Sequence, residues 1–454
     1  MRLKNSLAFL ATLAAAHAAF AVNPITPEGE FLSDPAPRVG EDGTLRLFGS
    51  RDAPEYGAIW CSHYNDIYET RDMEHWKILK GVLSSKGETD GIPETDLLLF
   101  APDGIFVNGQ WAVFYCTQDD KHVEGVAVSN TPEGPFKSLF TYPWANQIDP
   151  SIFRDGDGRL YYTFGQFDMK MCELKPDLSG FVPGTLRDNV VNEEQHGFHE
   201  GSQLFKRGDM YYLVFADISR RLRPTAIGYA TAKSPYGPYT YRGVIVDNYG
   251  CDPKTWNNHG GVAEYNGKWY VFYHRSTNGE GWLRKACVEE IHFDEDGFIA
   301  EVEQTSHGAG PLLDPFVETP GRIACVLSGN ARITTEKDGH EHLTGIKTGD
   351  MATWRYFDFK EPADKLTLVV VPTGGGVVEL RNGRGETFGR VSIPSGDGKT
   401  PIKVKMSLSR TFPAGRNAVT LVFSDGRRWG DRMVAELYMI ESFSFERQKE
   451  KRSQ

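Results

Sequence analysis

The chain has 454 residues, with 61 acidic and 50 basic side chains and a formal net charge of −11. This length is too great for one small domain and fits two. The acidic balance and the lack of a Lys/Arg-rich patch argue against nucleic acid as a partner. No stretch of the sequence is long and apolar enough to span a membrane.

The first 21 residues have the features of a signal peptide. Two basic residues precede an apolar run from Leu7 to Ala16, and Ala19-Phe20-Ala21 fits the small-x-small cleavage rule. We therefore expect residues 1–21 to be removed, with Val22 as the mature N-terminus of an exported protein, periplasmic or secreted. An uncleaved N-terminal anchor is the alternative interpretation.

Six cysteines are distributed along the chain. None forms a CxxC pair or has a histidine at close spacing, which argues against a zinc site. Export permits disulfides, and the sequence leaves open whether Cys61 pairs with another loop cysteine. The cysteines are Cys61, Cys116, Cys172, Cys251, Cys287 and Cys325.

Five similar segments follow, each with a short polar motif, a glycine and a hydrophobic, mostly aromatic strand. The glycines lie 49 to 66 residues apart, which suits four-stranded blades and predicts a propeller. The strands are Leu45–Phe48, Trp111–Tyr115, Leu160–Phe164, Met210–Phe215 and Trp269–Tyr273. The motifs are Ser33-Asp34-Pro35, Ala101-Pro102-Asp103, Ile148-Asp149-Pro150, His199-Glu200-Gly201 and Asn258-His259-Gly260.

The repeated pattern ends near Gly308, and Pro311 and Pro315 then mark a linker. Short alternating or buried strands with Gly-, Asn- and Asp-rich turns follow, as in a β-sandwich. No segment shows sustained helical periodicity. The predicted fold is therefore all-β: a five-bladed β-propeller over residues 22–310, followed by a β-sandwich (jelly roll) over residues 316–446.

Three carboxylates occupy corresponding motifs of the first, third and fourth repeats. Asp34, Asp149 and Glu200 each precede the repeat strand by a similar interval, and convergence at the propeller axis would supply the acid and base of glycoside hydrolysis. Asp-Pro is also a common turn dipeptide, so a turn or capping role is the alternative for Asp34. Glu200, ahead of an aromatic strand, has little structural reason to be there, and its alternative is a surface glutamate.

Together these motifs resemble glycoside hydrolase family 43 over residues 22 to about 310. The resemblance implies an inverting mechanism. It makes Asp34 the general base, Glu200 the general acid, and Asp149 the group that orients Glu200 and raises its pKa. The matching stretches are Asp34-Pro35, Phe48–Asp52, Ala101–Asp103, Ile148–Asp155, Glu200–Arg207 and Asn257–Gly260.

The same resemblance suggests further site residues. It implies that His259 faces the central channel and binds a calcium ion directly or through water, although no cofactor is required for the chemistry; a core histidine is the alternative. Arg275 and Arg284 match positions that are often basic, one of which reaches the sugar, and a salt bridge is the alternative for each. Phe100 stands where many members carry tryptophan and would stack on the terminal sugar.

The C-terminal part resembles carbohydrate-binding module family 6. Such modules stack sugar on an aromatic pair, yet no Trp or Tyr occurs between Thr387 and Arg428, and Met439 stands where an asparagine is expected. We interpret this part as a structural companion that has lost the usual glycan site and packs an apolar face on the propeller. The matching stretches are Ile346–Asp350, Arg355–Phe359, Gly374–Arg381 and Val422–Gly426.

These inferences converge on an exported, inverting exo-glycosidase that acts on side chains of plant or algal polysaccharides. The expected sugar is a terminal α-L-arabinofuranosyl unit, with β-D-xylosyl as first alternative and galactofuranosyl or galactosyl next. A non-catalytic glycan-binding propeller is the alternative of another class. The presence of all three carboxylates argues against it, because a binding protein has no need for the full set.

Overall fold

The structure, a computed structural model, describes residues 22–117, 124–427 and 435–447. Strands dominate it: the described ranges contain one short α-helix, α1 (Glu193–His196), and two 3₁₀ turns, Pro54–Tyr56 and Gly321–Ile323. The all-β prediction is confirmed. Within these ranges, no helix has the length and apolar character needed to cross a membrane. The predicted signal peptide lies outside the described residues.

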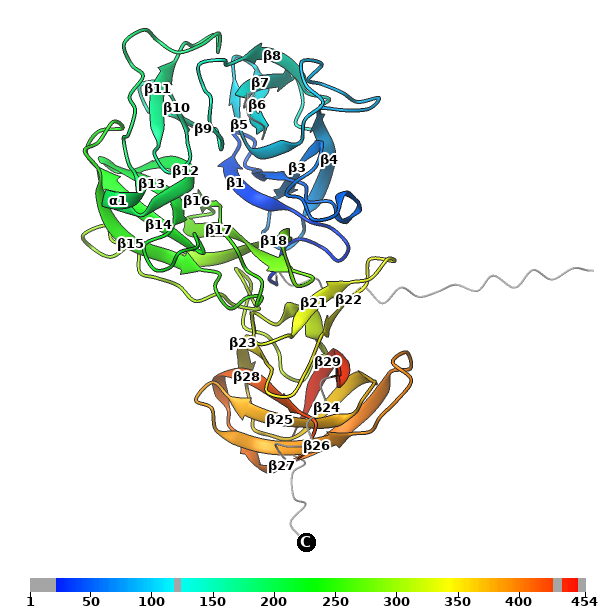
Figure 1. Cartoon of the computed structure of the whole chain (residues 1–454). Coiled ribbons are helices and arrows are strands. Elements are labelled where there is room, and N and C mark those ends of the chain that lie inside the picture. The colour runs from blue at the N-terminus through cyan, green and yellow to red at the C-terminus, as the bar shows by residue number, and fades with distance from the viewer. Residues whose placement is uncertain (1–21, 118–123, 428–434, 448–454) are drawn as a thin grey trace, which may run out of the picture.

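The N-terminal part consists of five antiparallel sheets (Figure 1). The first contains β1 (Ser33–Val39), β2 (Leu45–Ser50), β3 (Tyr64–Thr70) and β4 (Lys77–Ser84), and the second β5 (Leu99–Val107), β6 (Gln110–Thr117), β7 (Glu124–Ser129) and β8 (Lys137–Thr141). The third contains β9 (Ser151–Arg154), β10 (Leu160–Phe164) and β11 (Lys170–Leu174). The fourth contains β12 (Phe198–Arg207), β13 (Met210–Asp217), β14 (Ala226–Ala232) and β15 (Thr240–Asp247), and the fifth β16 (Gly261–Tyr265), β17 (Lys268–Thr277) and β18 (Glu280–Ile291).

The first strand of each sheet contacts the first strand of the next. These contacts join β1 to β5, β5 to β9, β9 to β12, β12 to β16 and β16 back to β1. The aromatic repeat strands are the second strands of their sheets. The polar motifs lie at or next to the start of the first, central strand of each sheet, which comes between the motif and the aromatic strand in the sequence. The third and fifth sheets have three strands, where the sequence predicted four.

Apolar clusters fill the space between each pair of neighbouring sheets. Side chains that alternate along one strand face opposite neighbours: Tyr162 packs toward the second sheet and Tyr161 toward the fourth. The same division separates Phe272, which faces the first sheet, from Val271, which faces the fourth. Because both faces are buried, the repeat strands are largely apolar, with Arg46 and Thr163 as exceptions, instead of alternating with polar residues.

A left-handed residue recurs where the central strands of four sheets begin. The backbone φ is 55° at Asp34, 28° at Ala101, 61° at Asp149 and 67° at Gly201. The pairing register of β1, β5 and β12 shifts at this point, as in a β-bulge, which re-aims side chains. The fourth sheet uses Gly201 at this position, so Glu200 lies one residue earlier than its two aspartate counterparts.

The C-terminal part consists of two antiparallel sheets with one apolar core between them. Trp354 and Phe443 are among the fully buried side chains of this core. One sheet contains β21 (Arg332–Thr335), β22 (Glu341–Thr344), β29 (Tyr438–Arg447), β24 (Ala363–Pro372), β27 (Ile402–Phe412) and the short β19 (Thr319–Pro320). The other contains β20 (Val326–Leu327), β23 (Met351–Phe359), β28 (Gly415–Ser424), β25 (Gly376–Asn382) and β26 (Thr387–Ile393).

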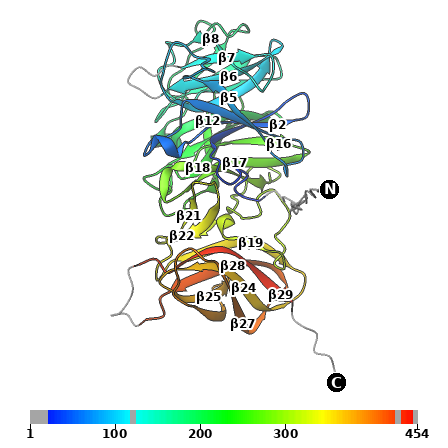
Figure 2. The same ribbon diagram turned by 90° about the vertical axis from the view of Figure 1, so that its right-hand side faces the viewer.

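Buried polar groups hold the two parts together, beside apolar contacts such as that of Val22 with the C-terminal core. Figure 2 shows β21 and β22 lying between the fifth N-terminal sheet and the other strands of the C-terminal sheets. Lys285 Nζ lies 2.5 Å from Glu341 Oε1 and donates to Pro27 O at 2.7 Å. Burial lowers the pKa of Lys285 to about 8. The apolar side chains of the C-terminal strands are used in their own core.

Arg275 belongs to this contact, so its sequence-based assignment to sugar binding is corrected. Its guanidinium is buried and donates to Ala324 O at 2.7 Å and Arg322 O at 2.9 Å. Both acceptors lie in the C-terminal part. These hydrogen bonds use the cation for cohesion between the two parts.

We predict that Arg275→Met lowers the free energy of unfolding by about 2 kcal/mol, because two charged hydrogen bonds are lost and two buried carbonyls lose their donor. The KM for substrate should stay at the wild-type value. Chemical denaturation and steady-state kinetics measure the two effects. Arg71→Met, at a side chain that is 69% exposed, is the control. A raised KM with unchanged stability would restore the sugar-binding assignment.

Candidate active site

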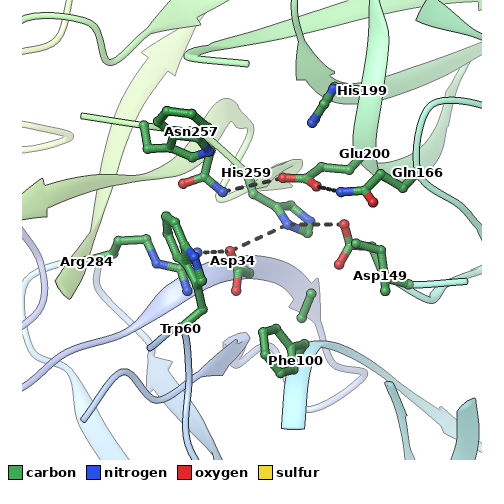
Figure 3. Close-up of a pocket in the computed structure, with 13 residues that line it drawn as sticks. Asp34, Trp60, Phe100, Asp149, Gln166, His199, Glu200, Asn257, His259 and Arg284 are labelled. Atoms are coloured by element: carbon green, nitrogen blue, oxygen red, sulfur yellow. Dashed lines mark hydrogen bonds and ion pairs between the residues drawn. The ribbon is translucent and has the colours of Figure 1, made fainter. Parts of the chain in front are cut away.

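A cavity of about 200 Å³ opens where the central strands begin (Figure 3). It brings together six of the seven predicted site residues, and Arg275 is the exception. Two tryptophans from loops complete one side of it. The cavity is lined by Asp34, Trp60, Phe100, Ala101, Ile148, Asp149, Gln166, His199, Glu200, Trp256, Asn257, His259 and Arg284.

Asp34 is held as a carboxylate. Its Oδ1 accepts from Arg284 Nη1 at 2.8 Å, and its Oδ2 accepts from Ser50 Oγ at 2.8 Å and from Ser33 Oγ at 3.3 Å. Burial alone would raise the pKa of Asp34, but the Arg284 charge holds it well below the usual range. An ionised, oriented carboxylate can accept a proton from water, as a general base must.

Arg284 is anchored by a second acid that the sequence analysis did not assign to the site. Asp52 accepts from Arg284 Nε at 2.9 Å and Nη2 at 2.8 Å, a two-pronged pairing, and from the Arg284 backbone amide at 2.9 Å. The guanidinium carbon lies 4.7 Å from the centre of the Trp60 ring. Arg284 therefore lines the pocket, but its donors are committed to Asp34 and Asp52.

Asp149, beside Glu200, differs from Asp34 in its electrostatic surroundings. Burial, followed by the negative charges of Glu200 and Asp34, raises the pKa of Asp149 well above its usual value. Asp149 Oδ2 is buried with no hydrogen-bond partner among the described residues. Because neighbouring carboxylates resist a second negative charge, these surroundings favour the protonated form of Asp149 beside Glu200.

Two side-chain amides orient Glu200. Gln166 Nε2 donates to Glu200 Oε2 at 2.8 Å, and Asn257 Nδ2 donates to Oε1 at a longer 3.4 Å. The Gln166 backbone amide is itself held by Gln147 Oε1 at 2.7 Å. Neutral donors fix the carboxyl group without adding a positive charge that would favour loss of its proton.

A buried histidine joins the two sides of the pocket. The Asp34 amide donates to His274 Nδ1 at 3.2 Å, and His274 Nε2 lies 3.1 Å from Asn257 Oδ1. Burial lowers the pKa of His274 to about 4, so the ring is neutral, accepts at Nδ1 and donates at Nε2. Asn257 must then present its amino group toward Glu200. His274 is a positioning residue.

His259 lies between the carboxylates and is accommodated by Gly201. His259 Nδ1 is 3.5 Å from Asp34 Oδ1 and 4.0 Å from Asp149 Oδ2. A Cβ on Gly201 would come within 2.7 Å of the imidazole ring, so glycine is required here for space as well as for its positive φ. This contact explains why a glycine directly follows Glu200.

The residues around His259 do not form a calcium cage. Ca²⁺ takes six to eight oxygen ligands, whereas Asp103, the carboxylate lining the narrow channel below His259, is engaged by Ser151 Oγ at 2.7 Å and the Ile152 amide at 3.0 Å. His259 also belongs to no described group of three ligand atoms within metal-binding reach. No step of the chemistry is assigned to calcium.

Several pocket residues were missed by sequence reasoning. Gln166, Trp60 and Trp256 lie in loops or at strand ends without a repeat signature. Asn257 belongs to a matching stretch, but its individual role was not predicted. The one usable signal was that the two tryptophans lie outside the apolar strands; Trp256 is 49% exposed. Exposed loop aromatics in an acidic pocket suit the faces of a sugar ring.

We predict that Asp149→Asn moves the alkaline limb of the kcat/KM profile to lower pH by about one unit. The raised pKa of Asp149 reflects burial first and then the negative charges of Glu200 and Asp34. Asparagine removes this carboxyl, and without a neighbouring like charge the remaining acid loses its proton more readily. kcat should also fall. A pH–rate series measures both, with the exposed Asp157→Asn as control. An alkaline limb that stays at the wild-type pH would contradict this effect of the Asp149 carboxyl.

We predict that His274→Ala lowers kcat about ten- to a hundredfold, because small misplacement of reacting groups is costly. KM should change much less, since His274 does not line the pocket. Steady-state kinetics on protein with an unchanged circular dichroism spectrum is the measurement. His75→Ala, at an exposed histidine, is the control. An equal rise in KM without loss of kcat would show that His274 serves binding instead.

Comparison with known proteins agrees with this geometry. The family described as "Glycosyl hydrolases family 43" matches residues 29–299, more than half of the chain. A "Xylosidase/arabinosidase" of Thermoclostridium stercorarium is 28% identical over 473 residues, which cover 88% of this chain and 95% of that protein.

Two solved structures extend the comparison. One is a Bacillus subtilis arabinoxylan arabinofuranohydrolase in complex with cellotetraose (TM-score 0.54, 21% identity, 95% of this chain and 98% of that chain). The other is CoXyl43, a β-xylosidase/α-arabinofuranosidase from a compost metagenome, with xylotriose in a calcium-free form (TM-score 0.53, 25% identity, 60% and 95%). The chain belongs to glycosyl hydrolases family 43, a family of inverting exo-acting and related glycosidases that need no cofactor for catalysis.

Proposed function

We propose that this protein releases single terminal sugars from polysaccharide side chains, with α-L-arabinofuranosyl as the preferred unit and β-D-xylosyl as the first alternative. Galactofuranosyl or galactosyl units come next. The observation that carries the proposal is the division of charge in the pocket. Asp34 is paired with a buried guanidinium, whereas burial and the nearby charges of Glu200 and Asp34 raise the pKa of Asp149 well above its usual value.

This division assigns the chemistry. Asp34 removes a proton from water as the water oxygen bonds to the anomeric carbon. Glu200 gives its proton to the glycosidic oxygen as the bond from that oxygen to the anomeric carbon breaks. Water attacks from the face opposite the leaving group, so the configuration inverts. Asp149 orients the acid, and Gln166 and Asn257 hold it in place.

The size and lining of the pocket favour removal of one unit. A cavity of about 200 Å³ is smaller than the ~300–1,000 Å³ of typical ligand pockets, so it suits one sugar ring. Trp60, Phe100 and Trp256 offer aromatic faces around the carboxylates. The choice of pentose rests on the similar proteins, whose names include xylosidase/arabinosidase and β-xylosidase/α-arabinofuranosidase.

The finer fold assignments belong to the same proposal. The ring of contacts between first strands and the apolar clusters between neighbouring sheets support a closed five-bladed propeller. The two C-terminal sheets support a jelly-roll module that resembles carbohydrate-binding module family 6 but serves as a structural companion. Export through a signal peptide over residues 1–21 remains part of the proposal, and it suits an enzyme that meets polysaccharide outside the cell.

We predict that Glu200→Gln lowers the rate on unactivated oligosaccharides roughly 10²–10⁴-fold, because the amide cannot deliver a proton. Nitrophenyl glycosides, whose leaving groups need less protonation, should lose less. The measurement is monosaccharide release from arabinoxylan, arabinan, xylan and galactan oligomers beside a nitrophenyl glycoside panel. Glu194→Gln, at an exposed residue of α1, is the control.

Arabinose release by the wild type would support the preferred sugar, and xylose or galactose release would select an alternative. Equal activity of the Glu200 variant and the wild type on an oligosaccharide would refute the acid assignment. Binding without release of any sugar by the wild type would favour the glycan-binding alternative.

A further inference from the structure

A second cluster of ligand-type side chains lies at the joint between the two parts, away from the catalytic pocket. His340 directly precedes β22, and His342 is the second residue of that strand. Glu441 lies on β29, which pairs with β22. One ligand atom from each residue lies within 4.8 Å of the other two. In the part of the chain that the structure describes, no other set of three meets this test.

Each imidazole faces two carboxylates, one at each ring nitrogen. His340 Nε2 lies 2.9 Å from Glu441 Oε2, and His340 Nδ1 lies 3.2 Å from Glu28 Oε2. His342 Nδ1 lies 3.1 Å from Glu441 Oε1, and His342 Nε2 lies 3.1 Å from Glu336 Oε1. A metal-bound histidine commonly donates its other ring N–H to a carboxylate, which fixes the ring and its tautomer. Both rings have this arrangement.

His342 supplies a second, independent observation. Its side chain is only 9% exposed, and Nδ1 is buried without a hydrogen-bond partner of acceptable geometry despite its closeness to Glu441. A buried polar atom normally has a partner. This nitrogen lies beside the same Glu441 carboxylate that His340 Nε2 contacts, and an ion held by the three residues would satisfy it.

We propose that His340, His342 and Glu441 bind one zinc ion, with Glu28 and Glu336 holding the two imidazoles from outside. Two imidazoles and a carboxylate are an established zinc donor set, with water in the fourth position. The cysteine spacing that argued against zinc in the sequence does not bear on this cluster, because it contains no cysteine.

The position of the cluster indicates a structural role. Glu28 precedes the first N-terminal sheet, whereas the three proposed ligands belong to the C-terminal part. Glu28 Oε1 also lies 2.7 Å from Arg322 Nε, and the neighbouring Glu341 meets the buried Lys285. None of the proposed ligands lines the catalytic pocket. A zinc ion here would fasten the polar contact between the two parts.

The experiment uses the full, tag-free chain after EDTA treatment and dialysis. We expect calorimetric titration with zinc chloride, and elemental analysis after gel filtration, to give one zinc per chain and a higher Tm. Calcium chloride should not reproduce the rise in Tm. His340→Gln, at a half-exposed side chain that is safe for folding, and Glu441→Gln should each weaken zinc binding at least tenfold. Glu28→Gln should weaken it by about 10- to 100-fold.

His292→Ala, at a histidine that is 78% exposed and outside the cluster, is the matched control and should bind zinc like the wild type. Absence of zinc from the wild type with no change in Tm would overturn the proposal and leave the cluster as a set of ion pairs. Equal binding by the wild type and the His340 and Glu441 variants would overturn it as well. The catalytic rate should be the same with and without zinc at temperatures well below Tm.

Discussion

The placement of one guanidinium decides how the pocket works. Arg284 is buried between Asp34 and Asp52, and it forms ion pairs with these two carboxylates. Asp149 and Glu200 form no ion pair with an arginine or lysine among the described residues. They lie near each other, and two side-chain amides donate to Glu200. Like charges at close range in a buried site cannot all ionise together. The position of this cation therefore distinguishes Asp34 from Asp149 and Glu200, as the proposed division into a base and an acid requires.

The scaffold that brings these groups together follows from burial on both faces of each sheet. Because every sheet packs against two neighbours, the second strand is largely apolar on both faces, and this run made the repeats visible in the sequence. The polar motifs, and with them Asp34, Asp149 and Glu200, could be located from the same repeats. Their convergence could therefore be predicted, together with the all-β class and the change of texture near Pro315.

Other features depend on contacts that no repeat encodes. The left-handed backbone at Asp34 and Asp149 is unusual for residues other than glycine, and a sequence pattern cannot distinguish it from an ordinary turn. The one-residue offset of Glu200 arises because Gly201 must make room for His259. Arg275 and Arg284 looked equivalent as basic residues near the end of the repeats, yet they point to opposite faces. Gln166 became a site residue only through its distance from Glu200.

That opposition of faces connects the catalytic pocket to the C-terminal part. On β17, His274 faces Asp34, whereas Arg275 faces the C-terminal carbonyls. On β18, Arg284 faces Asp34, whereas Lys285 forms an ion pair with Glu341. Arg275 and Lys285 are also directly paired across the two strands. Successive residues of a strand point to opposite sides, so one pair of strands positions Asp34 on one face and is held by the C-terminal part on the other. The C-terminal part can therefore influence the catalytic pocket, because it fixes the strands that set the charge and orientation of Asp34.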